Sequence, residues 1–393
     1  MTIRDLNKAA AWKFIILVGV VSLFSDMTYE GARSISGPFL GTLKASALVV
    51  GVVAGLGEFL GYALRLASGY LTDRLGRYWL ITFAGYAVNL LAVPLLALAG
   101  SWEIAAVLLV VERMGKAVRT PARDAMLSHA AGAVGRGWGF GFHEAMDQVG
   151  AVTGPLIVAA VLYYRGGYRE GFAVLLVPAV LALVVIAMAA RLYPHPQRLE
   201  VNTPALNPTG FTRPYWLYVV AAGLLGAGYA DFPLIAYHFG KTAVLPADWI
   251  PLFYAVAMGV DAVAALVLGR LFDRLGMPVI VVTAALSALF APLVFWGGFK
   301  LALLGMVLWG IGMGSLESII KAALADMVPR DRRATGFGLF NAGFGLFWLL
   351  GSVLMGLLYD FSLGALVAFS VTAQLLAIPF FLAVSKQVCL VRP

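Results

Sequence analysis

Ionisable side chains interrupt the first apolar stretch of this sequence, and their spacing places them on one helix face. Asp26, Glu30 and Arg33 are separated by four and three residues, with Tyr29 alongside. A charged group in hydrocarbon costs at least about 2.5–3.5 kcal/mol at a helix centre, so such groups normally face a cavity or a partner. The spacing predicts a polar site inside a membrane-embedded helix bundle.

Two other apolar stretches supply partners for this face. The second and fourth stretches carry Glu58, Glu112, Arg113 and Lys116. At a rise of 1.5 Å per residue, Glu112 and Arg113 fall at about the depth of Asp26, near the middle of a membrane. A carboxyl group beside an arginine there can exchange protons according to the face to which a cavity opens. We expect Asp26 to carry the proton, with Glu30 as second candidate and Arg113 as counter-charge; a fixed structural ion pair is the alternative.

The fifth apolar stretch contains His143-Glu144-Ala-Met-Asp147, which is close to the zinc-binding pattern H-E-x-x-H but ends in Asp. His143 and Asp147 share a helix face, yet no third ligand can be placed, so we expect no resident metal and no metal-dependent hydrolysis. Three interpretations stay open: a transported divalent ion, a second proton-relay group, and a hydrogen-bond network that packs helices.

The second half of the chain carries fewer charges and more aromatic residues. Its candidates for lining a substrate cavity, besides those above, are Asp231, Trp309, Glu317 and Asn341. Aromatic side chains would give an amphipathic substrate an apolar wall, although any single ring can equally pack in the core or face lipid.

Composition decides the class of protein that positions these residues. The 393 residues are 61% hydrophobic and 12% charged, against about 45–50% and about 25% in soluble domains. This excludes a soluble enzyme, a nucleic-acid-binding domain and a disulfide-stapled secreted protein. The single cysteine, Cys389, excludes an internal disulfide and thiolate metal sites, and no G-x-x-x-x-G-K-[ST] motif for ATP is present. We expect an integral membrane protein without a cofactor.

Twelve apolar segments are long enough to cross a bilayer. They lie near 12–37, 46–71, 78–99, 101–127, 136–163, 168–192, 214–239, 248–271, 277–297, 299–326, 333–359 and 362–385. The Pro-rich polar stretch 193–213 reads as a linker. We therefore predict an all-α integral membrane protein with a six-helix bundle over 1–192, a cytoplasmic linker over 193–213 and a second six-helix bundle over 214–393.

Basic residues gather in alternate connections between these segments. We therefore interpret the net charge of +8 as setting the orientation of the protein in the membrane. Among those assigned to connections are Arg74, Arg77, Arg119, Arg123, Arg191, Arg270 and Arg274. The positive-inside rule then places both termini in the cytoplasm, in a multi-pass protein of the cytoplasmic membrane.

The two halves also share short sequences. Gly69-Tyr-Leu-Thr-Asp73-Arg74-Leu-Gly76 recurs as Gly269-Arg-Leu-Phe-Asp273-Arg274-Leu-Gly276, and Arg136-x-x-Gly-Phe-Gly141 recurs as Arg333-x-x-Gly-Phe-Gly338. Two parallel, pseudo-symmetric repeats are indicated.

At this point the sequence resembles the major facilitator superfamily over nearly its whole length. The stretch Gly69-x-Leu-x-Asp73-Arg74-x-Gly76-Arg77 is similar to that family's loop motif between helices 2 and 3, departing at Tyr78. The resemblance implies a cytoplasmic gate, in which a carboxylate faces the positive end of a helix from the other half. Asp273 and Arg274 would act likewise in the second repeat. The alternative is a solvated turn that only fixes topology.

Two looser motifs resemble the drug/proton antiporter branch of that family. Arg113 resembles the arginine kept in helix 4 of many such antiporters, and Gly150-Ala-Val-Thr-Gly154-Pro155 resembles their helix 5 motif without the small pair expected after it. The glycines can equally be close-packing positions.

The resemblance implies the major facilitator fold and a secondary transporter in which one half rocks against the other. We expect proton influx exchanged for efflux of a small amphipathic molecule by a monomer, with helices 1, 4, 7 and 10 lining the cavity. Proton symport and export of a divalent metal through Asp26, Glu30, His143 and Asp147 are alternatives with the same fold. A membrane-embedded enzyme or a non-transporting sensor is the alternative of another class.

Overall fold

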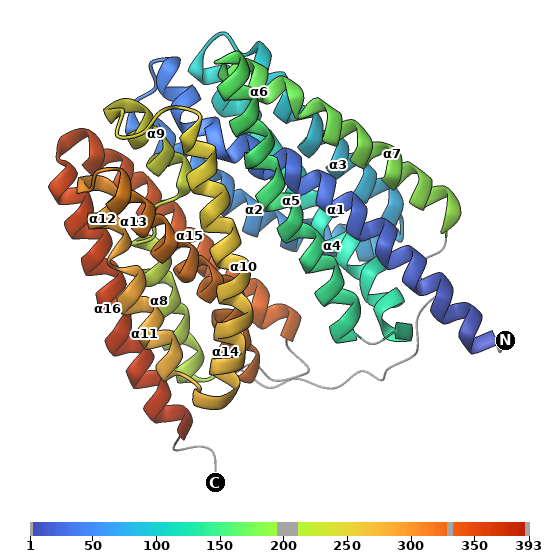
Figure 1. Ribbon diagram of the computed structural model, residues 1–393. Coiled ribbons are helices and arrows are strands. Elements are labelled where there is room, and N and C mark those ends of the chain that lie inside the picture. The colour runs from blue at the N-terminus through green and yellow to red at the C-terminus, as the bar shows by residue number, and fades with distance from the viewer. Residues whose placement is uncertain (1–2, 135, 195–210, 328–332, 390–393) are drawn as a thin grey trace. The chain divides into compact units, whose positions relative to one another are not determined.

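A computed structural model describes residues 3–134, 136–194, 211–327 and 333–389, and within these ranges the secondary structure is helical (Figure 1). The first half contains α1 (Ile3–Thr42), α2 (Ala47–Leu75), α3 (Tyr78–Leu95), the short η1 (Leu96–Leu98), α4 (Trp102–Val134), α5 (Arg136–Arg165), α6 (Tyr168–Val174) and α7 (Leu176–Leu192). The second half contains α8 (Arg213–Ala227), α9 (Phe232–Thr242), α10 (Trp249–Leu275), α11 (Pro278–Ser287), α12 (Phe290–Trp296), α13 (Phe299–Gly314), the π-helical η3 (Ser315–Ile319), α14 (Ile320–Met327), α15 (Arg333–Phe361) and α16 (Leu363–Cys389).

Eleven segments of the described chain are long and apolar enough to cross a membrane. The segment missing from this set is α4, although its 33 residues are more than long enough to span a bilayer. Its hydropathy is lowered by charged residues that repeat along the helix, among them Arg113, Lys116, Arg119 and Arg123. The twelve predicted spans thus correspond to eleven apolar ones and one strongly charged helix.

Contacts divide the chain into two units. Unit 1 comprises Met1–Ile35 and Leu60–Pro204, and unit 2 comprises Ser36–Phe59 and Ala205–Pro393. The helices α1 and α2 therefore each contribute one part to unit 1 and another to unit 2. Most of the predicted linker, 195–210, lies outside the described residues, and the predicted bundle boundaries at 192 and 214 remain predictions.

In unit 1, α1 packs on several neighbouring helices through apolar side chains. Phe14, Ile15 and Val18 of α1 join Met126 and Leu127 of α4 in one buried cluster. In a second cluster, α1 meets α3 and α7 through residues that include Val21, Tyr86, Leu90 and Ile186. Burying these side chains brings the face of α1 that carries Asp26 against α3 and α4.

In unit 2, α8 packs against α15 and α16, and α10 packs against α13. The beginning of α2 also belongs to this unit. Its first two backbone amides, at Ala47 and Leu48, donate to the Asp360 carboxylate at 3.4 and 3.0 Å. Since the first amides of a helix have no partner within it, Asp360 caps α2 from the last turn of α15.

The repeated motif falls at the ends of α2 and α10. Arg74 and Arg274 lie in the last helical turn of each, rather than on the turn itself. Gly76 and Gly276 follow with φ of +63° and +69°, a left-handed conformation that glycine adopts without strain. The side chains of Asp73 and Asp273 are outside the described part of the chain, so their gating role stays a prediction.

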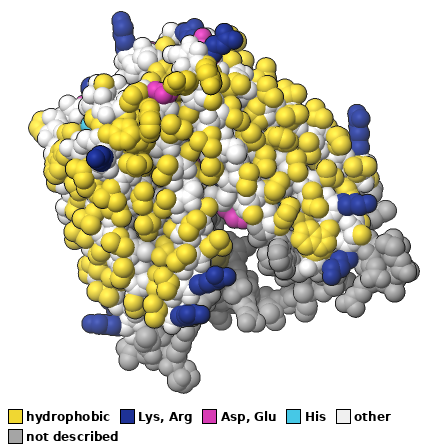
Figure 2. All heavy atoms as spheres, in the orientation of Figure 1, with side chains coloured by type: hydrophobic (Ala, Val, Ile, Leu, Met, Phe, Trp, Pro, Cys, Tyr) yellow, Lys and Arg dark blue, Asp and Glu magenta, His cyan; other side chains and the backbone are white. Residues whose placement is uncertain are grey.

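Hydrophobic side chains cover most of the face shown in Figure 2, and Lys and Arg side chains gather toward its margins. Leu98, Leu266 and Phe361 are examples of large apolar side chains that are more than two-thirds exposed. A surface of this kind is stable only against lipid.

Candidate functional site

The centre of the candidate site in unit 1 is an ion pair between α1 and α4. The guanidinium Nη2 of Arg119 lies 3.9 Å from Oδ1 of Asp26, and the two side chains are 0% and 14% exposed. Arg119 also places its guanidinium carbon 4.2 Å from the centre of the Tyr86 ring of α3. None of the three guanidinium nitrogens has a hydrogen-bond acceptor among the described residues. The pair is therefore close and buried but not locked by direct hydrogen bonds.

Close backbone approaches position this pair. A Cβ at Gly150 would overlap the carbonyl of Leu23 and lie 3.1 Å from Cβ of Asp26, and one at Gly154 would overlap the carbonyl of Met27. Only glycine lets α5 pack this tightly against the turn of α1 that carries Asp26. The helix 5 glycines thus have a packing role, which is the alternative that the sequence left open.

A chain of polar contacts lies one helical turn from Asp26. Arg123 Nη2 binds Asp124 at 2.8 Å, and Arg123 Nη1 donates to the Ser22 hydroxyl at 3.1 Å. The Ser22 hydroxyl lies 2.9 Å from Nε2 of His143, and Nδ1 of His143 lies 3.6 Å from Asp147. These contacts join α4, α1 and α5, and they bring the two predicted helix 5 residues next to the face of α1 that carries Asp26.

A second group of charges on α4 contacts Tyr29, which follows Asp26 by three residues on α1. Arg113 and Lys116 lie over the Tyr29 ring at 4.5 and 3.7 Å from its centre. Glu112 contacts Arg113 at 3.7 Å and accepts hydrogen bonds from the Asn89 amide of α3. The Glu112 carboxylate thus has both an amide donor and a nearby cation inside the bundle, and Arg113 has both a carboxylate and an aromatic ring. Charges in a membrane interior normally have such partners.

The remaining charged candidates fall in different surroundings. Glu30 and Arg33 are buried in unit 1, and Glu58 is half-buried in the part of α2 that belongs to unit 2. Glu144 and Glu317 are exposed, and Asn341 is half-buried on α15.

In unit 2 the seventh span is broken between α8 and α9. The carbonyl of Gly228 accepts hydrogen bonds from Ser370 at 2.6 Å and Gln374 at 3.2 Å, and Trp309 Nε1 donates to the carbonyl of Ala230 at 2.9 Å. Side chains of α13 and α16 thus replace the helical hydrogen bonds lost at the break.

The broken segment carries a buried acid inside a cluster of rings. Asp231, 2% exposed, accepts a hydrogen bond of 3.1 Å from Nε1 of Trp348. The Tyr229 ring lies 5.5 Å from Trp309 and 5.9 Å from Trp348, centre to centre. Discontinuous membrane helices of this kind often form substrate sites in transporters.

Sequence reasoning missed two members of the unit 1 site. It assigned Arg119 and Arg123 to a connection, whereas the structure places both inside α4, Arg119 fully buried. The spacing Arg113, Lys116, Arg119, Arg123 puts four cations on one helix face, a signal that could have identified them. Arg119 lies within 4 Å of Asp26, in the position where the sequence analysis predicted Arg113.

Within the described residues, no group of three or more His, Cys, Asp or Glu side chains is arranged to hold a metal ion. His143 and Asp147 provide two ligands at most, and His143 Nε2 is already engaged by Ser22.

Comparison with known proteins places the chain in a family. The sequence model of the Major Facilitator Superfamily matches residues 17–301 and 232–388. An uncharacterised protein of Mycobacterium tuberculosis is 41% identical over 95% of this chain and 93% of its own length. An uncharacterised transporter of the same superfamily from Methanocaldococcus jannaschii is 26% identical over 91% of this chain and 90% of its own length.

A solved transporter of the POT family in complex with 5-aminolevulinic acid superimposes with a TM-score of 0.76, over 96% of both chains and at 12% identity. At that identity the likeness concerns the fold alone. Together with the eleven apolar helices and the charged α4, these matches establish an all-α membrane protein of the twelve-helix type. The chain belongs to the major facilitator superfamily and is a secondary transporter.

Proposed function

We propose that the protein exchanges protons for a small amphipathic molecule, which it exports, and that Asp26 carries the proton. The observation that supports this most directly is the buried Asp26–Arg119 pair, 3.9 Å apart. When Asp26 is ionised, the two charges compensate each other in a medium of low dielectric constant. When Asp26 is protonated, Arg119 loses this compensating charge, and since its guanidinium has no hydrogen-bond acceptor in the described part of unit 1, it must find another anion or water.

This asymmetry can couple protonation to a change of conformation. An arginine without hydrogen-bond acceptors beside a neutral acid is costly in one arrangement of the helices and is relieved in another that gives it a partner. Proton binding therefore shifts the balance between the two arrangements, which a coupled transporter requires.

The Arg123–Ser22–His143–Asp147 chain supplies a second proton-relay group in this proposal. Ser22 lies four residues before Asp26 on α1, so the two side chains are one helical turn apart. The Ser22 hydroxyl accepts from Arg123, which keeps its own protons, and contacts Nε2 of His143. As Ser22 gives its proton to that nitrogen, its oxygen would take one up from a water molecule in the open cavity, so that the hydroxyl relays one proton. Asp147 would orient the imidazole.

In unit 2 we assign the apolar part of the cargo to the rings around the broken span, Trp309 and Trp348 among them, with Asp231 as their polar group. For the mechanism we propose that halves 1–192 and 214–393 rock about the linker 193–213. The motifs ending at Gly76 and Gly276 would gate the cytoplasmic side, where both termini would lie.

Proton release from purified protein tests this proposal. Candidate compounds and metal ions are added to weakly buffered protein, and we expect an amphipathic organic compound to release protons from the wild type and none from Asp26→Asn. Glu170→Gln is the matched control, because this exposed carboxylate at the start of α6 belongs to no part of the proposed site. Loss of release in both variants, or in neither, would count against Asp26 as the carrier.

Proteoliposomes with an imposed pH gradient separate export from symport. Antiport predicts that the compound moves against the direction of proton flow, whereas symport predicts movement with it. Release by a divalent ion but by no organic compound would replace the proposed cargo with a metal.

A further inference from the structure

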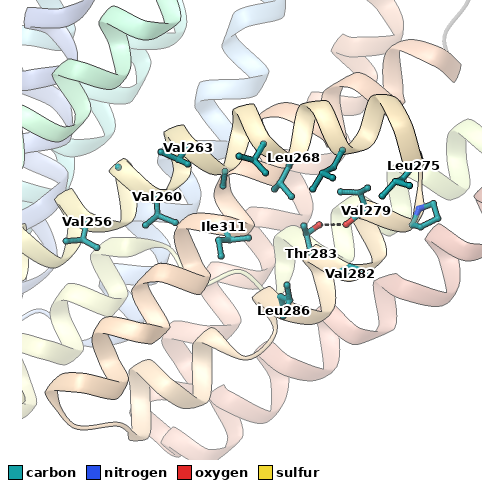
Figure 3. Close-up of a pocket in the computed structure, with 15 residues that line it drawn as sticks. Val256, Val260, Val263, Leu268, Leu275, Val279, Val282, Thr283, Leu286 and Ile311 are labelled. Carbon is teal, nitrogen blue, oxygen red and sulfur yellow. Dashed lines mark hydrogen bonds between the residues drawn. The ribbon is translucent and has the colours of Figure 1, made fainter.

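An apolar groove runs along α10 in unit 2. It encloses about 780 Å³ between α10 and α11, with Ile311 of α13 at its floor (Figure 3). Its lining is apolar apart from Thr283, whose hydroxyl donates to the Val279 carbonyl at 2.9 Å and lies 3.1 Å from Ser315. The groove thus offers no unpaired polar group to water or to a polar substrate.

One stripe of α10 forms the long wall of this groove and ends in two cations. Val256, Val260, Val263 and Val267 line the groove at spacings of four, three and four residues. Continuing the same spacing along the helix leads to Arg270 and Arg274, which are exposed. The apolar groove and the two guanidinium groups therefore share one face of one helix.

The length of α10 places these cations at the edge of the hydrocarbon. Trp249 begins the helix, and Arg270 follows 21 residues later, a rise of about 32 Å. This matches the bilayer core of about 30 Å, with a tryptophan at one interface and arginines at the other. The α11 helix begins at Pro278, beside the end of α10, so its positive dipole end adds to the charge at this level.

We propose that this groove is a binding site for an anionic phospholipid, with an acyl chain along the valine stripe and the phosphate at Arg270 and Arg274. In a bilayer, a hollow lined by exposed apolar side chains such as Val263, Val267 and Val282 is suited to an acyl chain, and two exposed arginines at the headgroup level select a negative headgroup. The positive-inside pattern predicts that this end is cytoplasmic, where anionic lipids carry the surface charge. This inference does not depend on the direction of transport or on its cargo.

Non-denaturing mass spectrometry of the purified full chain, titrated with phosphatidylglycerol and phosphatidylcholine, tests the headgroup. With two arginines at the membrane surface, we expect phosphatidylglycerol to bind about thirty-fold more tightly than phosphatidylcholine. The double variant Arg270→Gln with Arg274→Gln should lose this preference. Arg191→Gln, an exposed arginine in the last turn of α7, should keep it.

Gly259→Leu tests the groove itself. A Cβ at this lining position meets no atom within 4 Å, so the leucine fills the hollow without moving the backbone. Binding of both lipids should fall. Gly269→Leu is the matched control, because it also meets open space on α10 but does not line the groove.

Three results would overturn the proposal: phosphatidylglycerol preference that survives removal of both arginines, an equal loss in Arg191→Gln, or unchanged binding in Gly259→Leu. A dimer that Gly259→Leu abolishes would assign the groove to a second copy of the chain instead. Binding of a transported compound that competes with both lipids and is lost in Gly259→Leu would assign it to cargo.

Discussion

The Asp26–Arg119 pair allows a quantitative test of the unit 1 site. At 3.9 Å and an effective dielectric constant of about 20, the attraction between the two charges is about 4 kcal/mol. Removing one partner leaves the other charge buried and should lower the free energy of unfolding by roughly 3–5 kcal/mol. Removing both, in Asp26→Asn with Arg119→Gln, should cost less than the sum of the single changes.

A double-mutant cycle measures this difference as a coupling free energy, from unfolding of the detergent-solubilised protein. We expect a coupling of about 3–4 kcal/mol, because neither side chain has bulk water to replace its partner. The Arg123–Asp124 pair is the comparison: its atoms are closer, at 2.8 Å, but Asp124 is 44% exposed. Its coupling should be only about 0.2–1 kcal/mol. A coupling below about 1 kcal/mol for Asp26–Arg119, or a larger one for the exposed pair, would refute the reasoning that burial outweighs distance here.

Three further predictions address neighbouring features. Gly154→Ala forces a Cβ into the α1 backbone and should cost about 1–3 kcal/mol of stability in thermal unfolding, whereas Gly61→Ala, which meets open space, should be neutral or mildly stabilising. Ser22→Ala breaks the link between the α4 cation and the α5 imidazole, so proton-coupled exchange should slow about tenfold while cargo binding stays the same; equal rates would remove the relay from the mechanism. Asp360→Ala deprives α2 of its cap and should cost about 0.5–1 kcal/mol, with a stability unchanged within error arguing that the contact contributes nothing.

The helices themselves were largely readable from the sequence, because hydropathy and helix starts are local properties. The repeated Arg-x-x-Gly-Phe-Gly sequence is assigned to a fifth helix in each half, and it lies in the helices α5 and α15, in the first residues of each that the structure describes. The break in the seventh span was not predicted. It is held open by Ser370, Gln374 and Trp309, which lie 79 to 146 residues from the carbonyls that they bind, and no local pattern reports such partners.

The cation beside Asp26 could not be identified from the estimated depth of each residue in the membrane alone. A rise of 1.5 Å per residue gives Arg113 the depth of Asp26 only if the two helices enter the membrane at matching points and run parallel. The actual offset between α1 and α4 is set by how the chains pack against α3. There a Cβ at Gly85 would lie 2.6 Å from the backbone nitrogen of Arg119, so this glycine brings Arg119 into the interior at the level of Asp26. From the sequence alone, a basic residue in the last third of a predicted span is assigned to a cytoplasmic connection by the positive-inside rule, as Arg119 was. The same residue is a buried counter-charge here because Gly85 of α3 lets the backbone of α4 approach closely at Arg119, whose side chain is fully buried.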